Sequence, residues 1–321
     1  MSGKDKYIMD LNNQPLVSVP VVTYNSSKFV LETLDSIKAQ TYQNIELIIS
    51  DDFSKDNTVE LCQKWVEQNK GRFVRTEIIT SEINTGVSAN LNRAEALCQG
   101  EWVKIVDGDD VLLPYCIERL IENTFINPNQ HFVFGDLVCF NDDTILTDYL
   151  VDFLDESFYD LTAYDQYKRL VIKGNCLPCP TFFYNRKIMV RLGIKNDESI
   201  PLCEDYPRWI NITRNNQRIY RLKEVIVKYR IRGNSLSNED SIKFKKSSAN
   251  VYLKYCFYEQ LKDTPMLAFF RYCCVKYFLT SFAIFLVMIF LLKVINKISS
   301  FFTNRTFVDN HYKQRYICKA N

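Results

Sequence analysis

Residues 16–58 read LVSVPVVTYNSSKFVLETLDSIKAQTYQNIELIISDDFSKDNT, and this stretch decides the fold class. It opens with a β-branched run at 16–23, continues with apolar residues at helical spacing across 28–40, and returns to an apolar run at 45–50. A strand, an amphipathic helix and a second strand in this order make a βα repeat. Chains built from such repeats form a mainly parallel sheet with helices packed against it.

The same alternation continues after residue 58. Capping oxygens at Asp56, Asn57 and Thr58 predict the start of the next helix. Further strands are predicted at 73–80, 101–106, 131–134, 180–184 and 225–231, and further helices at 87–98, from Pro114 onward and at 204–215. The predicted fold class is therefore α/β, with a Rossmann-like, mainly parallel sheet flanked by helices.

The bulk composition fits one large folded domain with an appendage. The chain has 321 residues, of which 47% are hydrophobic and 24% charged, and both values are close to ordinary globular usage. Its formal net charge is only +2, whereas a nucleic-acid binder needs clustered and uncompensated Lys and Arg. We therefore expect no nucleic-acid partner.

The N-terminal segment indicates the cellular compartment, and the scarcity of histidine restricts the possible catalytic mechanisms. Residues 1–14 are polar and contain no apolar run of the signal-peptide type, so we expect the catalytic portion to stay in the cytosol. In that compartment the eleven cysteines are expected to be free thiols. The chain has two histidines, His131 and His311, so it offers few candidates for the histidine of a Ser–His or Cys–His mechanism. Carboxylates must carry the chemistry.

Residues 239–321 form a C-terminal region with a helical pattern and an apolar segment at 277–292. That segment, YFLTSFAIFLVMIFLL, carries no charge and is flanked on both sides by Lys and Arg. As a helix it would be about 24 Å long, which is shorter than a hydrocarbon core of roughly 30 Å. A spanning helix, a helix lying on the membrane and a buried helix all remain open. We predict contact with the cytoplasmic face of the cell membrane.

Acidic residues follow two of the predicted strands. An aspartate pair at 51–52 follows the strand IELIIS, and the sequence DGDD at 107–110 follows the strand EWVKIV. Ligands of parallel α/β sheets bind outside the carboxyl ends of the strands, so both clusters are expected at one edge of the sheet. Two carboxylates spaced i and i+2 can share a hard cation that bridges a diphosphate. The sequence contains neither GxGxxG nor GxxxxGK[ST], so a backbone phosphate cradle is not expected.

The stretch that opens at Val17, together with NTGVSANLNRAEALCQGEWVKIVDGDD at 84–110 and YRIRGNSLS at 229–237, resembles glycosyltransferase family 2. These are inverting enzymes with a GT-A fold, and the resemblance covers roughly Pro15 to Ser237. It implies three parts: a polar segment at 1–14, a GT-A domain at 15–238 and a helical C-terminal region at 239–321.

The resemblance implies a donor site for a nucleotide sugar, with UDP as the expected nucleotide. Thr23 and Tyr24 are expected to lie against the uracil and ribose, and Asp52 is expected to hydrogen-bond the base. Asp107 and Asp109 match the DxD element of the family. Asp107 is expected to contact the nucleotide and to share Mn²⁺ or Mg²⁺ with Asp109, which is the more direct ligand.

The pair Glu204-Asp205 resembles the ED element of the family, which implies that Asp205 is the general base and Glu204 a supporting residue. An inverting transfer needs one base to take the proton of the acceptor hydroxyl while the nucleotide leaves from the opposite face. From the residues alone another interpretation stays open, in which Asp205 merely stabilises the start of a helix through the helix dipole.

Three positions depart from the pattern of the family. Leu91 stands where many relatives have arginine, so one diphosphate contact is missing. Arg232 stands where many have histidine, and it could contact the diphosphate directly as a bidentate donor. Pro20 lies two places earlier than the usual proline, a change expected to affect strand geometry more than chemistry.

The function implied by the resemblance is inverting transfer of a sugar from a nucleotide sugar to a glycan or lipid-linked glycan acceptor in surface polysaccharide synthesis. Two alternatives are weighed against it. A sugar-phosphate nucleotidylyltransferase would want a Gly-rich, basic loop after the first strand, and VTYNSSKF lacks one. A non-catalytic, membrane-anchored nucleotide-sugar-binding protein would be free to lose Asp205, which is present here.

Overall fold

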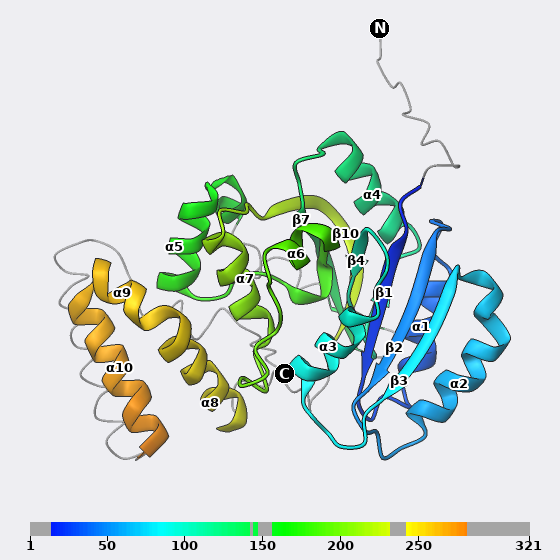
Figure 1. Cartoon of the computed structure of the whole chain (residues 1–321), viewed down its shortest axis with the longest axis horizontal. Helices are drawn as coiled ribbons and strands as arrows, with labels where there is room; N and C mark the ends of the chain where they lie inside the picture. Colours follow the sequence, from blue (N-terminus) through cyan, green and yellow to red (C-terminus); the bar gives the residue numbers. More distant parts are fainter. Residues whose placement is uncertain (1–13, 142–143, 147–155, 232–241, 281–321) are drawn as a thin grey trace, which may run out of the picture.

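A computed structural model of the chain describes residues 14–141, 144–146, 156–231 and 242–280 (Figure 1). The strands are β1 (Val17–Thr23), β2 (Ile45–Asp51), β3 (Arg75–Thr80), β4 (Trp102–Lys104), β5 (Val106–Asp107), β6 (Val111–Leu112), β7 (Phe132–Asn141), β8 (Thr144–Leu146), β9 (Phe182–Asn185) and β10 (Tyr220–Arg230). The α-helices are α1 (Val30–Lys38), α2 (Thr58–Asn69), α3 (Val87–Ala96), α4 (Cys116–Ile126), α5 (Ala163–Lys173), α6 (Arg186–Arg191), α7 (Asp205–Arg214), α8 (Ile242–Val251), α9 (Phe257–Asp263) and α10 (Pro265–Thr280). A π-helical turn, Tyr252–Cys256, joins α8 to α9.

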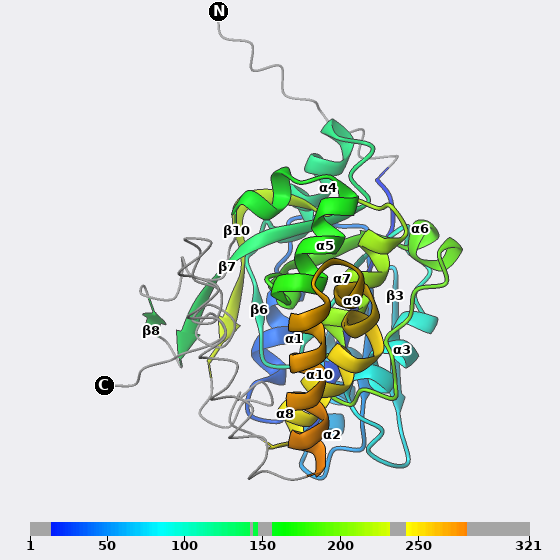
Figure 2. The same cartoon turned by 90° about the vertical axis from the view of Figure 1, so that its left-hand side faces the viewer.

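The strands form one sheet in the order β3-β2-β1-β4-β9-β7-β10-β6, with β5 paired to β1 and β8 paired to β7. Strands β1 to β5 pair in parallel, as βα repeats require. Strand β9 is antiparallel to β4 and β7, and β10 is parallel to β7. Helices lie on both sides of the sheet (Figures 1 and 2), so the predicted α/β class is confirmed.

The strand predicted at 101–106 is interrupted between β4 and β5. The parallel register pairs Ser18 with Val103 and Val21 with Val106, which puts the interruption beside Pro20 of β1. Proline has no N–H to donate to a neighbouring strand, so the ladder is not continuous at that level. The effect of Pro20 is therefore on strand geometry, and β1 itself runs unbroken from Val17 to Thr23.

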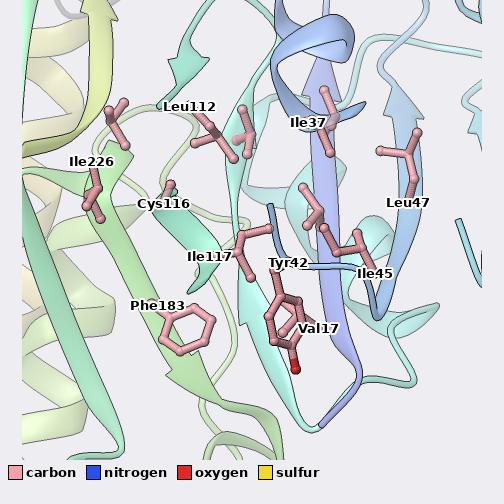
Figure 3. Close-up of a cluster of buried hydrophobic side chains, with 14 of the residues drawn as sticks. Val17, Ile37, Tyr42, Ile45, Leu47, Leu112, Cys116, Ile117, Phe183 and Ile226 are labelled. Carbon is pink, nitrogen blue, oxygen red and sulfur yellow. The ribbon is translucent and has the colours of Figure 1, made fainter. Parts of the chain in front are cut away.

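Two apolar cores cover the two faces of the sheet. Helices α1, α2 and α4 pack on one face, where Ile37 and Phe183 lie in the same buried cluster (Figure 3). Helices α3, α5, α6 and α7 pack on the other face. There the ring of Trp209 in α7 lies edge-on to Phe182 of β9 with a centroid distance of 4.4 Å. This packing fixes α7, whose first residue is Asp205, against the sheet.

Helices α8 to α10 dock on α5 and α7 rather than on the sheet (Figure 2). The buried Gln260 side chain donates a hydrogen bond of 2.6 Å to the Val171 carbonyl, and Arg271 donates one of 3.1 Å to the Ile172 carbonyl. Lys168 pairs with Asp263 at 2.7 Å. These polar contacts hold α9 and α10 against α5.

Several predicted features fall wholly or partly outside the described residues. Residues 1–13, Arg232 and residues 281–292 of the apolar segment are among them. Within the described ranges, none of the helices combines the length and the apolar character that a membrane crossing requires.

Candidate functional site

The carboxyl ends of β1, β2 and β5 meet at one edge of the sheet. Thr23 pairs with Asp51 in the parallel register, and Val22 pairs with Asp107. The Thr23 hydroxyl, which is almost fully buried, donates a hydrogen bond of 2.7 Å to the Asp51 carboxylate. Tyr24, the next residue, is 42% exposed. The two predicted acidic clusters therefore lie at one edge, with Tyr24 as the accessible aromatic surface beside them.

The Asp52 carboxylate is held in a dense hydrogen-bond network. It accepts from the backbone N–H groups of Thr85 and Gly86 at 3.0 and 2.7 Å, from the Thr85 hydroxyl at 2.6 Å and from Arg93 at 2.8 Å. Burial alone would raise the pKa of Asp52, but these donors lower it below its ordinary value. A direct bond from Asp52 to a nucleotide base would have to share this carboxylate with Arg93, a residue that the sequence did not single out.

The DGDD sequence forms a tight turn against the end of β1. The Gly108 N–H donates to the Val22 carbonyl at 2.9 Å, and a Cβ at this position would lie 2.8 Å from the Thr23 methyl group. Only glycine fits such a close approach. Asp110 is buried, and burial together with the negative charges of Asp109 and Asp107 raises its pKa well above the ordinary value. The turn thus brings together carboxylates whose negative charges repel one another.

Arg230, at the end of β10, holds this turn in place. Its backbone N–H donates to the Asp110 carboxylate at 3.0 Å, and its Nε donates to the Asp109 carbonyl at 2.9 Å. The guanidinium pairs with Glu32 of α1 and lies over the rings of Phe29 and Phe140, 4.6 and 4.2 Å from their centroids. One almost fully buried side chain therefore ties the acidic turn to α1 and to the far end of the sheet.

Arg230→Lys is expected to lower the free energy of unfolding by about 1–3 kcal/mol, because lysine lacks both the Nε donor and the planar surface that stacks on the rings. The loosened turn is also expected to weaken UDP binding in Mn²⁺ roughly tenfold, measured by calorimetry. Arg119→Lys is the control. The Arg119 side chain is half exposed, and ion pairs of such side chains contribute about 0–1 kcal/mol to the free energy of unfolding. Equal urea midpoints for the two variants would contradict the assignment.

The Glu204-Asp205 pair stands at the start of α7, after a backbone constraint. Cys203 has a φ of +66°, a left-handed conformation uncommon for a residue other than glycine. The Asp205 carboxylate accepts a 2.7 Å hydrogen bond from the Asn175 side chain and another of 2.7 Å from the Tyr206 N–H. Asn175 precedes the turn into β9 and carries no motif that the sequence could have revealed.

The Glu204-Asp205 pair and the DGDD turn are linked electrostatically. Burial first, and then the charges of Asp205 and Asp107, raise the pKa of Glu204 from 4.5 to about 8. The buried Cys179 thiol has its pKa raised well above the ordinary value by burial, and then by Asp205, Glu204 and Asp107. The negative charges of Asp107, at the end of β5, and of the pair at the start of α7 therefore both act on the Cys179 thiol.

Helix α7 is oriented by a buried ion pair. Arg208, with 2% of its side chain exposed, makes two parallel bonds of 2.9 and 2.8 Å to the carboxylate of Glu95 in α3. The same carboxylate accepts from the Tyr184 hydroxyl of β9 at 2.5 Å. Because a paired Arg and carboxylate form a rigid fork, this network fixes the start of α7 relative to the donor side of the sheet.

The sequence model of glycosyl transferase family 2 matches residues 18–192, more than half of the chain. The chain belongs to this family. It is a glycosyltransferase, and the matched residues include Asp52 and the DGDD turn. The nucleotidylyltransferase alternative is set aside by this match.

Similar proteins include a curated relative and two solved structures. A UDP-Glc:alpha-D-GlcNAc-diphosphoundecaprenol beta-1,3-glucosyltransferase of Escherichia coli, WfaP, is 28% identical, over 82% of this chain and 92% of its own length. TarS of S. aureus, solved with UDP-GlcNAc, has a TM-score of 0.59 at 19% identity, over 77% of this chain and 66% of its own. A mannosyltransferase of Pyrobaculum calidifontis, solved with GDP-Man and Mn²⁺, has a TM-score of 0.53 at 20% identity, over 79% and 66%. These structures confirm the predicted GT-A fold.

The donor residues fit a divalent cation only in part. Among the described residues no group of three or more His, Cys, Asp or Glu side chains is placed to hold a metal ion. One Asp110 oxygen is buried and has no hydrogen-bond partner within the described residues, and the carboxylates of the turn repel one another. Magnesium is usually held by one or two carboxylates plus substrate phosphates. The residues therefore fit a cation that takes its remaining ligands from a bound diphosphate.

Proposed function

We propose that this glycosyltransferase is an inverting enzyme that transfers a sugar from a UDP-sugar, with Mn²⁺ or Mg²⁺, to a lipid-linked or growing glycan. The proposal rests mainly on one observation: the segment that leads into the Glu204-Asp205 pair contacts α3 beside the Asp52 network, where the Ser88 hydroxyl donates to the Ile200 carbonyl at 2.9 Å. The DGDD turn would supply carboxylates for a diphosphate-bound cation, and the pair would supply the base.

The donor end of the reaction is assigned to the β1, β2 and β5 ends. Tyr24 would cover the base and ribose, and Asp52 with Arg93 would border the base. Asp107 and Asp109 would hold the cation. When bound, the cation neutralises the charge that develops on the departing nucleoside diphosphate. No general acid is then required on the donor side.

The acceptor end is assigned to the start of α7. Asp205 takes the proton of the acceptor hydroxyl as that oxygen forms the new glycosidic bond, and the bond from the sugar to the diphosphate breaks on the opposite face. Asn175 holds one oxygen of Asp205 by donating to it, which aims the carboxylate. Glu204, with its raised pKa, holds its proton near neutral pH and is therefore suited to orienting neighbours rather than to accepting the proton.

The acceptor class is taken from relatives and from the C-terminal region. WfaP, and a second E. coli relative with the same printed activity, WfgD, at 26% identity over 72% of this chain, use a GlcNAc-diphosphoundecaprenol acceptor. Such an acceptor lies in a membrane, and the apolar segment at 277–292 with its basic flanks suits contact with the cytoplasmic face of the cell membrane.

UDP release tests the proposal. The full-length protein is incubated with UDP-glucose, UDP-GlcNAc or UDP-galactose in Mn²⁺, with and without a GlcNAc-diphosphate lipid. Release that depends on both Mn²⁺ and the lipid supports transfer. Binding of UDP without any release would instead favour the non-catalytic binding protein, and no binding of UDP would contradict the donor assignment.

The raised pKa of Glu204 predicts a pH-dependent stability. The folded protein holds this proton more tightly than the unfolded chain, so the contribution of Glu204 to stability is complete below its ordinary pKa of 4.5 and is lost as the pH rises through about 8. The slope reaches at most about 1.4 kcal/mol per pH unit. In EDTA, urea unfolding of Glu204→Gln should show a flatter pH profile than the wild type, and Glu82→Gln, an exposed control, should keep the original slope. A Glu204→Gln profile parallel to that of the wild type would contradict the assigned pKa.

A further inference from the structure

The charges of this chain are strongly segregated along the sequence. Residues 242–321 contain 13 of the 40 Lys and Arg but only 3 of the 38 Asp and Glu, a net charge of +10, and residues 1–241 carry −8. The overall charge of +2 hides this division. An acidic catalytic domain is thus joined to a basic C-terminal region, and such a region is attracted to anionic surfaces.

The described part of the basic region gathers its lysines at one end. Lys243, Lys245 and Lys246 are all exposed in the first two turns of α8, and no acidic residue stands in the first turn. Cations at a helix N-terminus oppose the helix dipole, so this arrangement is unfavourable for the isolated helix.

A fourth lysine, Lys276, comes from α10, which runs antiparallel to α8 (Figures 1 and 2). The end of α8 is tied to the first turn of α10, where the hydroxyl of Tyr252, the residue after α8, donates to the Ala268 carbonyl at 3.0 Å. By helical rise, Lys243 lies about 14 Å before Tyr252 along α8, and Lys276 lies about 12 Å after Ala268 along α10. Because the helices are antiparallel, both displacements point toward the same end. The start of α8 and the exposed Lys276 therefore lie at the same end of the appendage.

The uncharged segment begins at this same end. Its first residues, 277–280, complete α10 directly after Lys276, and sequence without charge continues to residue 292. Stable membrane association generally takes two signals, such as an apolar element and a polybasic patch. Here both signals start from one end of two packed helices.

We propose that this basic end, defined as Lys243, Lys245, Lys246 and Lys276, docks on the anionic surface of a phospholipid bilayer. It deepens the proposed function, because a lipid-linked acceptor would be presented at that surface. Ser248 in the same helix lies 3.5 Å from the Cys203 sulfur, and Cys203 directly precedes Glu204. Ser248 is only about 8 Å along α8 from Lys243, so docking would hold the acid pair near the headgroups.

Vesicle flotation of the full-length protein tests the docking surface. Vesicles of phosphatidylcholine with phosphatidylglycerol are compared with phosphatidylcholine alone, for the wild type and for the triple variant K243Q/K245Q/K246Q. Each lysine near an anionic surface contributes roughly fivefold to partitioning, so the triple variant should bind the mixed vesicles about 10²-fold more weakly. The wild type should prefer the mixed vesicles and lose binding as salt rises.

The matched control is K38Q/K64Q/K187Q, which removes the same charge from exposed lysines of the catalytic domain and should bind like the wild type. Equal binding by the two triple variants, or equal binding of the wild type to both vesicle types, would overturn the proposal. Calorimetry with UDP and Mn²⁺ on the same samples keeps the two proposals apart. Absence of UDP binding in the wild type would contradict the donor assignment while leaving the vesicle result interpretable.

Discussion

Asp205→Asn is expected to slow acceptor-dependent transfer by about 10² to 10⁴, the usual consequence of removing a general base. Asparagine is nearly isosteric, and its single amide oxygen can keep the bond from the Tyr206 N–H. Its NH2 group then replaces the oxygen that accepts from the Asn175 side chain, so that one bond is lost while the start of α7 keeps its other contacts. Asparagine cannot, however, take the proton of the acceptor hydroxyl. The measurement is the rate of UDP release with the lipid acceptor, beside the affinity for UDP.

Affinity for UDP should stay within about twofold of the wild type in Asp205→Asn, since the assigned donor contacts lie at the ends of β1, β2 and β5. Glu204→Gln is the matched comparison and should be much milder in rate, because its assigned part is to orient neighbours. A transfer rate in Asp205→Asn within threefold of the wild type would remove Asp205 from the mechanism. A larger loss of transfer rate in Glu204→Gln than in Asp205→Asn would make Glu204 the base and Asp205 the supporting residue.

Asp109→Ala is expected to abolish the Mn²⁺-dependent part of UDP binding, a loss of about 10²-fold or more in affinity. The chain has no backbone cradle motif for phosphates, so the assigned cation would carry most of the attraction to the diphosphate. The Asp109 backbone carbonyl, which accepts from Arg230, remains in the variant, so the turn should survive. Calorimetry with UDP in Mn²⁺ and in EDTA measures the effect.

In EDTA the wild type and Asp109→Ala should bind UDP equally weakly. Asp160→Asn, at an exposed aspartate before α5, is the control and should bind UDP in Mn²⁺ like the wild type. The assignment fails if the wild type keeps its full UDP affinity in EDTA, because no cation would then be needed. It also fails if Asp109→Ala binds UDP in Mn²⁺ as the wild type does.

The fold class and the donor edge could be predicted from the sequence because both depend on local regularities. Apolar residues repeat with the period of a strand at 16–23 and with that of a helix at 28–40, and these periods decide what each segment can bury. Acidic residues placed directly after strands must then lie at the carboxyl edge of a parallel sheet. The positions of Asp52 and Asp109 followed from this rule, whereas their functional parts remain proposals.

Only the tertiary structure decided how distant segments complete the site. Arg230 holds the turn at Asp109 from 121 residues away, and Asn175 reaches Asp205 across 30. The burial of Lys104 could not be predicted from the sequence either. Its side chain is fully buried, and its ammonium group donates to the carbonyls of Ile105 and Pro180. A sequence pattern records which face of a segment is apolar, but a hydrogen bond between remote segments depends on how the layers stack. The lysines of the basic end can be read from the sequence. Their closeness to the Glu204-Asp205 pair was decided by the tertiary structure, because α8 packs beside Cys203.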